Sequence, residues 1–370
     1  MDEQGTATRF GLNPRAALFV LLVFSLSRLL VFGAMATSSL VLPRSQVAGW
    51  DLDNPILRPL FRWDTGWYLS IATRGYSYDG NPEKQQNVVF FPLYPLTCRL
   101  CHAITGVSVP LCGVVLSNGA FLGALATLYV LVTREVGAAS ARLTLVLLSF
   151  FPGSLFFSTM YTESFYLLFS AQAFLAFQRE RFILGGGWVG LASATRLPGI
   201  LLLAPLFARA PSPLKDRQTF GRVILAALLG VCGLAGFMTY QLIAFGDPFV
   251  YIRDELAWGK FSAHLFGRVR TSIPAAFDAG FTLAFGALTY VVFRTLPRGY
   301  GIYTVLSIMV PLAGGQTRGM TRYLAVLFPG FIALAVMGQE RRWIPWFAIP
   351  AFAFGLGYLC VRFAQWYFAS

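Results

Sequence analysis

Long apolar stretches separated by short polar turns run along almost the whole chain. A helix needs about 20 mostly apolar residues to cross the hydrocarbon core of a bilayer. The pattern predicts transmembrane helices at 16–40, 110–132, 140–158, 160–178, 182–196, 197–209, 222–244, 270–293, 300–316, 322–338 and 343–363. We therefore expect an all-α polytopic membrane protein with about 11 transmembrane helices and a single transmembrane domain over residues 1–370.

Two parts of the chain fit this pattern less simply. The adjoining stretches 182–196 and 197–209 are short, and they predict either two half-buried helices or one broken hairpin. Segment 88–107 is apolar but contains Pro92, Pro95, Arg99 and His102. We interpret that segment as a juxtamembrane or re-entrant helix.

Composition supports the membrane interpretation. The chain is 56% hydrophobic and only 12% charged, whereas soluble domains carry about 25% charged residues. Its net charge of +13 could indicate nucleic-acid binding, but the positive residues lie in short turns between apolar stretches, as the positive-inside rule requires. The five cysteines form no disulfide framework. Segment 16–42 is too long for a signal-peptide core and is interpreted as the first span.

The basic turns predict the orientation in the membrane. Alternating spans place five of them on one side, which should be cytoplasmic: Arg134 and Arg142; Arg179 and Arg181; Arg209, Lys215, Arg217 and Arg222; Arg294 and Arg298; Arg341 and Arg342. The opposite side then receives a long first extracytoplasmic loop, 43–109, and a second, 246–269. These loops combine acids, arginines and aromatic residues, including Trp50, Asp51, Asp53, Asp247, Asp254 and Trp258. Long loops in compact proteins are usually functional or disordered, and this aromatic content favours function.

Asp64 is the first candidate for catalysis. It belongs to the run RWDTGWYLSIATRGY, in which Trp63, Trp67, Tyr68 and Ile71 have helical spacing, so a short interfacial helix is expected. Asp64 would lie near the first turn of that helix. It is either a helix cap or a carboxylate that acts as a general base at the membrane surface.

Three further charged residues lie beside or between apolar spans. Glu163 is either an ordinary interfacial residue or a functional carboxylate at membrane depth. Arg196 and Arg322 are either arginines that extend to the interface from helix ends or ligands for a lipid phosphate or diphosphate. All three are expected on the same extracytoplasmic side as Asp64.

Other patterns are weaker. Asp51 and Asp53 form a D-x-D pair that could bind a divalent metal, but such a pair is also common in a solvated turn. Cys98-Arg99-Leu100-Cys101-His102 matches the c-type haem pattern, which we interpret as a coincidence. We assign no cofactor and no metal ligand; a divalent metal remains an unsupported alternative. The sequence contains no Walker, Rossmann or nucleophile-elbow motif, so a transferase would need a lipid-borne donor.

Several segments, taken in order, resemble the PIG-V-like mannosyltransferases, which add the second mannose to GPI anchors, and their prokaryotic relatives. They are RWDTGWYLSIATRGYSYDG, NVVFFPLYPL, YTESFYLLF, ATRLPGILLLAP, FGDPFVYIRDELAWG and TRYLAVLFPGFIALA, and they cover roughly residues 60 to 335. The resemblance implies a class C glycosyltransferase, a polytopic enzyme whose large first outer loop carries the catalytic acid.

By that resemblance Asp64 would be the base, Arg196 and Arg322 would bind the leaving phosphate, and Glu163 would orient hydroxyl groups. Arg62, Trp63 and Tyr94 would complete the substrate site. Mannose would pass, with inversion, from a polyprenyl-phosphate donor to a glycolipid or cell-envelope acceptor. We expect other membrane lipids but no nucleic acid as partners, and an accessory membrane subunit is an open alternative. The expected location is the plasma membrane of a prokaryote, or the endoplasmic reticulum in a eukaryote. The alternative function is a lipid or glycolipid transporter or flippase without transferase activity.

Overall fold

The structure, a computed structural model, describes residues 12–46, 51–81, 83–255, 273–314 and 318–367. Within these ranges the regular structure is entirely helical. The longer helices are α1 (Pro14–Ala36), α5 (Val109–Val136), α6 (Ala138–Phe150), α7 (Glu163–Gln178), α8 (Phe182–Thr195), α10 (Arg217–Phe245), α12 (Ile273–Thr295), α13 (Arg298–Ala313), α15 (Phe328–Glu340) and α16 (Trp343–Ala364). Short elements connect them: α2 (Ser38–Val41), η1 (Arg58–Leu60), α3 (Thr65–Arg74), η2 (Asn87–Val89), α4 (Leu93–Thr105), η3 (Pro152–Phe157), η4 (Leu197–Leu202), α9 (Leu203–Ala208), α11 (Val250–Asp254) and α14 (Met320–Ala325).

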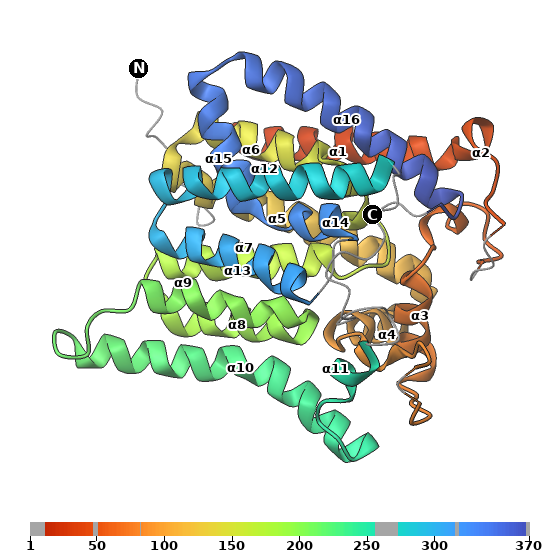
Figure 1. Ribbon diagram of the computed structural model, residues 1–370, viewed down its shortest axis with the longest axis horizontal. Helices are drawn as coiled ribbons and strands as arrows, with labels where there is room; N and C mark the ends of the chain where they lie inside the picture. The colour runs from red at the N-terminus through yellow and green to blue at the C-terminus, as the bar shows by residue number, and fades with distance from the viewer. Residues whose placement is uncertain (1–11, 47–50, 82, 256–272, 315–317, 368–370) are drawn as a thin grey trace.

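The longer helices lie side by side with their axes running roughly the same way (Figure 1). The α9–α10 connection and the start of α16 lie at one end of this bundle, and α2, α3, α4 and α11 lie at the other. Five helices, α1, α5, α10, α12 and α16, are long and apolar enough to cross a membrane. The chain is an integral membrane protein with a helical bundle, as expected; the number of 11 spans stays a prediction.

Several predicted spans are divided in the structure. The stretch 140–158 was expected to be one helix, but α6 ends at Phe150 and η3 begins at Pro152. Proline has no N–H to donate and restricts the residue before it, so the helix cannot continue through this point. The stretch 322–338 is likewise divided into α14 and α15, with Pro329 in the first turn of α15, where proline is tolerated. The first span, expected at 16–40, ends at Ala36 and is followed by the separate turn α2.

The short pair 182–209 consists of a helix, a break and a second helical segment. Helix α8 ends at Thr195, Arg196 has an extended backbone, and η4 runs into α9. Gly199 lies so close to α8 that a Cβ atom there would be 2.3 Å from the carbonyl carbon of Ala192. Only glycine permits this approach. The break therefore places the Arg196 side chain at the end of α8, inside the bundle.

The loop 43–109 is folded where the structure describes it. It contains η1, α3, η2 and α4, and α3 begins beside Asp64 as the aromatic spacing predicted. With 13 residues, α4 is too short to cross a bilayer, which agrees with a juxtamembrane or re-entrant helix for 88–107. Trp50, Trp258 and His264 lie outside the described residues. The limits assigned to the two outer loops, 43–109 and 246–269, stay predictions.

Arg28 is a charged residue in the middle of α1 that the sequence analysis did not single out. Its side chain is buried and donates to the Ser154 carbonyl (3.0 Å), the Ser154 hydroxyl (2.6 Å) and the Ser158 hydroxyl (2.8 Å). Its guanidinium carbon lies 4.6 Å from the centroid of the Phe121 ring. Arg28 thus joins α1 to η3 and to the turn after it, and this turn leads to the charged site described below.

Candidate active site

Asp64 lies at the loop end of the bundle, directly before the first residue of α3. Asp64 occupies the N-cap position of α3, but its side chain makes no capping hydrogen bond to the backbone of that helix. The carboxylate instead accepts a hydrogen bond from Arg322, with Nη1 2.6 Å from Oδ2. Trp63, the preceding residue, has a φ of +55°, a conformation that costs energy for a tryptophan. This strained turn directs the Asp64 side chain toward Arg322 of α14.

Glu163 joins the two arginines. It is the first residue of α7 and is fully buried. Its Oε1 accepts hydrogen bonds from Nη1 of Arg196, at 2.6 Å, and from Nε of Arg322. Asp64, Glu163, Arg196 and Arg322 form one connected set of charges, here called the acid–arginine cluster. Two negative and two positive groups balance, which is how charge is tolerated at membrane depth.

The side chains of the cluster differ in exposure. Glu163 is 0% exposed, whereas the side chains of Arg196, Arg322 and Asp64 are 10%, 15% and 23% exposed. Arg196 uses Nη1 and Arg322 uses Nε and Nη1 in these ion pairs, so each guanidinium keeps further N–H groups for another acceptor. Asp64 is the most exposed of the four. A ligand would therefore meet Asp64 and the remaining N–H groups first.

Aromatic rings surround the cluster. The Tyr161 ring lies 4.6 Å from the guanidinium carbon of Arg322, and the Phe156 ring lies 5.5 Å from it. The Tyr161 hydroxyl accepts from the Asp64 backbone N–H (3.2 Å) and donates to the Arg62 carbonyl (3.3 Å), on either side of Trp63. Tyr161 therefore stabilises both the arginine and the strained turn that carries the acid.

Asp278 holds in place the start of α14, the helix that carries Arg322. It is buried in α12 and accepts hydrogen bonds from the N–H of Gly319 (2.9 Å), and from the N–H and hydroxyl of Thr321 (2.7 Å each). These bonds tie the start of α14, the short helix that carries Arg322, to α12. Asp278 is therefore a positioning residue, and a lone acid within the apolar stretch 270–293 was the sequence signal for it.

Three residues expected to bind substrate lie outside the cluster. The Arg62 guanidinium donates to the Ala364 carbonyl (2.9 Å) and pairs with Asp51 (3.2 Å), which links the first loop to the end of α16. Trp63 packs edge-on against Trp366. Tyr94 is buried in α4 and donates to the Gly113 carbonyl at 2.9 Å. These contacts hold the loop on the bundle, and the substrate-binding roles assigned to the three residues stay predictions.

Asp51 of the D-x-D pair takes part in ion pairs. It contacts Arg44 at 2.6 Å in addition to Arg62. Partial burial raises the pKa of Asp51, but the hydrogen bond from Arg44 and the charges of Arg62 and Arg44 outweigh it and hold the pKa below its ordinary value. Among the described residues no group of three or more histidine, cysteine or acidic side chains could hold a metal ion. The two ion pairs of Asp51 brace the loop.

A further buried acid, Asp254, lies in α11 and is not part of the acid–arginine cluster. Asp254, in α11, accepts one hydrogen bond, from Nε2 of Gln86 at 3.3 Å. Its other oxygen, Oδ2, is buried and has no hydrogen-bond partner among the residues that the structure describes. Burial raises the pKa of Asp254 to about 6, although the bond from Gln86 opposes the shift. The charge of this carboxyl group should therefore change near pH 6.

Known protein structures share this fold. The oligosaccharyltransferase of Archaeoglobus fulgidus in its apo form aligns with a TM-score of 0.53 and 12% identity, over 95% of this chain and 56% of that chain. The same archaeal enzyme in complex with an inhibitory peptide and a dolichol-phosphate gives a TM-score of 0.53 and 13% identity, over 94% and 56%. ArnT from Cupriavidus metallidurans bound to undecaprenyl phosphate gives 0.53 and 16%, over 88% and 61%. This chain therefore spans less than two thirds of the length of each.

The chain therefore shares the GT-C fold of these proteins. The family model described as Mannosyltransferase (PIG-V) matches residues 7–250. The chain belongs to this PIG-V mannosyltransferase family, which confirms the resemblance seen in the sequence. A search of curated protein sequences finds no match.

Proposed function

We propose that this protein transfers mannose, with inversion, from a polyprenyl-phosphate carrier to a glycolipid or cell-envelope acceptor. Asp64 is the general base, and the acid–arginine cluster binds the phosphate of the carrier. The observation that carries the proposal is the direct contact of Asp64 with Arg322, which is itself joined through Glu163 to Arg196. The reaction takes place on the extracytoplasmic side of a prokaryotic plasma membrane, where the acid-rich loops are expected.

The free edges of the two guanidinium groups suit a phosphate. Arginine presents its N–H groups as a planar fork that matches phosphate oxygens, and a charge-assisted bond of this kind is roughly twice as strong as a neutral one. Glu163 holds the guanidinium groups of Arg196 and Arg322 close together because its Oε1 accepts a hydrogen bond from each. The solved structures with a dolichol-phosphate and with undecaprenyl phosphate show lipid phosphates bound to proteins of this fold. These features support a polyprenyl-phosphate donor for this chain.

The carboxylate of Asp64 suits proton transfer. Its Oδ2 is occupied by Arg322, while Oδ1 accepts no hydrogen bond from the described residues. In the proposed reaction the oxygen of the acceptor hydroxyl forms a bond to the anomeric carbon of mannose. Oδ1 of Asp64 takes the proton of that hydroxyl at the same time. The bond from this carbon to the phosphate oxygen breaks, and the electron pair leaves with polyprenyl phosphate. Arg196 and Arg322 stabilise the negative charge that develops on the departing phosphate.

The test is sugar transfer by the purified full-length protein, given radiolabelled polyprenyl-phosphate mannose and a membrane lipid extract. We expect Asp64→Asn to lower the rate by about 10²- to 10⁴-fold, the usual contribution of a general base. The matched control is Asp53→Asn, the same change at an exposed residue of the same loop, which should retain activity. Normal transfer by Asp64→Asn would discard the assigned base, and movement of label across the bilayer without a labelled product would favour a transporter.

A further inference from the structure

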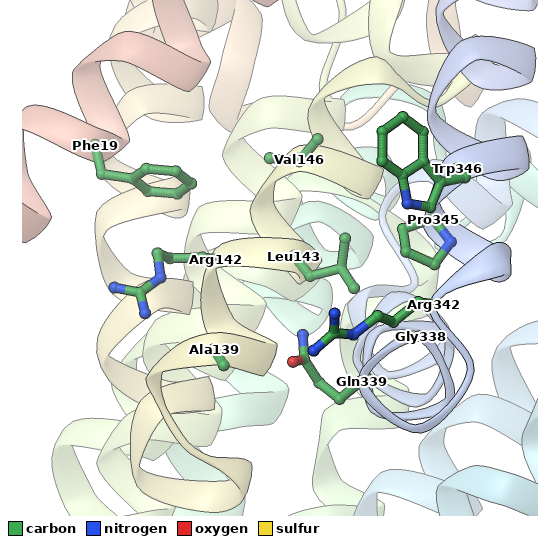
Figure 2. Close-up of a pocket in the computed structure, with 10 residues that line it drawn as sticks. All are labelled: Phe19, Ala139, Arg142, Leu143, Val146, Gly338, Gln339, Arg342, Pro345 and Trp346. Atoms are coloured by element: carbon green, nitrogen blue, oxygen red, sulfur yellow. The ribbon is translucent and has the colours of Figure 1, made fainter.

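A groove of about 390 Å³ opens at the end of the bundle opposite to the acid–arginine cluster. It lies between α1, α6 and the connection from α15 to α16. Figure 2 shows its lining side chains, of which six matter here: Phe19, Arg142, Val146, Gln339, Arg342 and Trp346. No role in sugar transfer follows from its position, so the groove needs its own explanation.

Two arginines on different elements line the groove. Arg142 belongs to α6, and Arg342 directly precedes α16. Neither side chain takes part in an ion pair or hydrogen bond within the part of the chain that the structure describes. Arg209, which belongs to another basic turn, is paired with Glu135 at 3.3 Å. Two unpaired guanidinium groups at a membrane boundary are well placed to bind an anion.

The remaining wall of the groove is apolar. Phe19 of α1 and Val146 of α6 contribute to it, and Trp346 closes the side formed by α16 (Figure 2). Trp346 is 78% exposed and nearby Trp343 is 60% exposed. Exposed tryptophans on a membrane helix are typical of the level of the lipid headgroups. The groove therefore combines cationic groups and an apolar surface at the depth where a phospholipid changes from headgroup to acyl chain.

The charge of this end indicates which lipid fits. It carries the basic turns that predict the cytoplasmic side, and the cytoplasmic leaflet holds anionic lipids. A zwitterionic headgroup would bring its own cation toward Arg142 and Arg342, whereas an anionic headgroup brings only negative charge. A free phosphate ion would leave the apolar wall unused.

We propose that this groove binds an anionic glycerophospholipid of the cytoplasmic leaflet. Arg142 and Arg342 hold its phosphate, and one acyl chain follows Phe19, Val146 and Trp346. The site is separate from the acid–arginine cluster and does not depend on the proposed transferase activity. Its occupant fills the space between the first helix and the last, so the lipid should also stabilise the bundle.

The experiment is native mass spectrometry of the full-length protein titrated with phosphatidylglycerol or with phosphatidylcholine. We expect phosphatidylglycerol to be retained preferentially, and the double variant Arg142→Gln/Arg342→Gln to weaken its binding by roughly tenfold or more. The matched control is Arg294→Gln/Arg298→Gln, which removes the same charge from exposed positions of another basic turn and should keep the preference. Thermal unfolding in phosphatidylcholine should show that both double variants are folded.

A third variant tests the apolar wall without changing charge. Val146→Trp fills the groove and should also weaken phosphatidylglycerol binding. Equal loss of binding in the two double variants would mean that surface charge alone attracts the lipid, and would overturn the proposal. Unchanged binding in both Arg142→Gln/Arg342→Gln and Val146→Trp would overturn it too. Displacement of the lipid by millimolar inorganic phosphate would identify a free anion, not a lipid, as the occupant.

Discussion

Arg322 donates a hydrogen bond from Nη1 to Oδ2 of Asp64 over 2.6 Å, although the two residues are 258 positions apart in the chain. The same guanidinium donates through Nε to Glu163. One side chain thus connects the first outer loop, the start of α7 and the helix α14. In the proposed reaction this arginine binds the donor phosphate next to the base, so donor binding and proton transfer take place at one point.

Arg322→Lys should lower transfer strongly although it preserves the positive charge. Arg322 contacts Asp64 through Nη1 and Glu163 through Nε, two nitrogens of one planar group. A lysine has a single charged nitrogen and cannot reproduce this geometry. We expect a loss of about 10²-fold in kcat/KM, close to that of removing one charge-stabilising donor. Steady-state kinetics measures it, with Arg318→Lys, an exposed neighbour, as the control that keeps activity. Equal activity in both variants would show that charge alone suffices.

Glu163→Gln should destabilise the protein as well as inactivate it. The change removes the carboxylate partner of Arg196 and one of the two carboxylate partners of Arg322. The side chain that changes, Glu163, is fully buried. Breaking a buried ion pair costs about 3–5 kcal/mol. Thermal unfolding in detergent should show a clear fall in the midpoint, while Glu180→Gln, the same change at an exposed site just after α7, should leave it unchanged. An unshifted midpoint in Glu163→Gln would contradict the structural part of this account.

Asp278→Asn should act on the site through α14. In the native protein Gly319 N–H donates to Oδ2 of Asp278 and Thr321 N–H donates to Oδ1. The variant replaces one of these oxygens with an NH₂ group, so one of the two N–H groups faces a donor and loses its acceptor. We expect a loss of stability of about 1–3 kcal/mol. We also expect a rise in KM for the donor, because the start of α14 no longer fixes Arg322. Thr321→Val removes only the hydroxyl bond and should produce a smaller change of the same kind. A loss of stability with an unchanged donor KM would make Asp278 purely structural.

Asp254 should make stability depend on pH. Its folded-state pKa is raised from 3.8 to about 6, so the folded state binds the proton more tightly than the unfolded state does. Its contribution is therefore favourable at low pH and is lost as the pH rises from about 4 to 6, and the nearby charge of Asp79 adds to the penalty. The change in pKa from 3.8 to about 6 corresponds to at most about 3 kcal/mol, and solvent screening reduces this value, so Asp254→Asn should gain about 1–2 kcal/mol at pH 7 and almost nothing at pH 4. Unfolding midpoints measured across this pH range provide the test, and an equal gain at both pH values would contradict it.

Much of the fold followed from the sequence because a lipid environment leaves few choices. Each apolar stretch must form a helix to satisfy its backbone, so the helices α1, α5, α10 and α16 lie close to their predicted positions. Breaks at Pro152 and within 322–338 were missed because the apolar pattern continues through them. Hydrophobicity reports that a segment is buried in lipid or protein, but not whether its backbone is continuous there.

The candidate site was predictable in part. Asp64, Glu163, Arg196 and Arg322 stood out as charges beside apolar spans, and alternating topology placed them on one side. Tyr161, Phe156 and Asp278 were not singled out, although Tyr161 is only two residues from Glu163. Aromatic residues are common in this chain, so a ring that contacts an arginine has no distinct signal in the sequence.

By itself the sequence determined the membrane environment, the helical class and the family, and it predicted that the four charged residues lie on one side. Those properties depend on local composition and on the order of motifs, which are read along the chain. Only the tertiary structure decided that Arg322 pairs with Asp64, that Glu163 joins both arginines, and that Arg62 braces the loop against α16. Such pairings depend on helix packing and on the direction of each side chain, and contacts across hundreds of residues leave no local pattern.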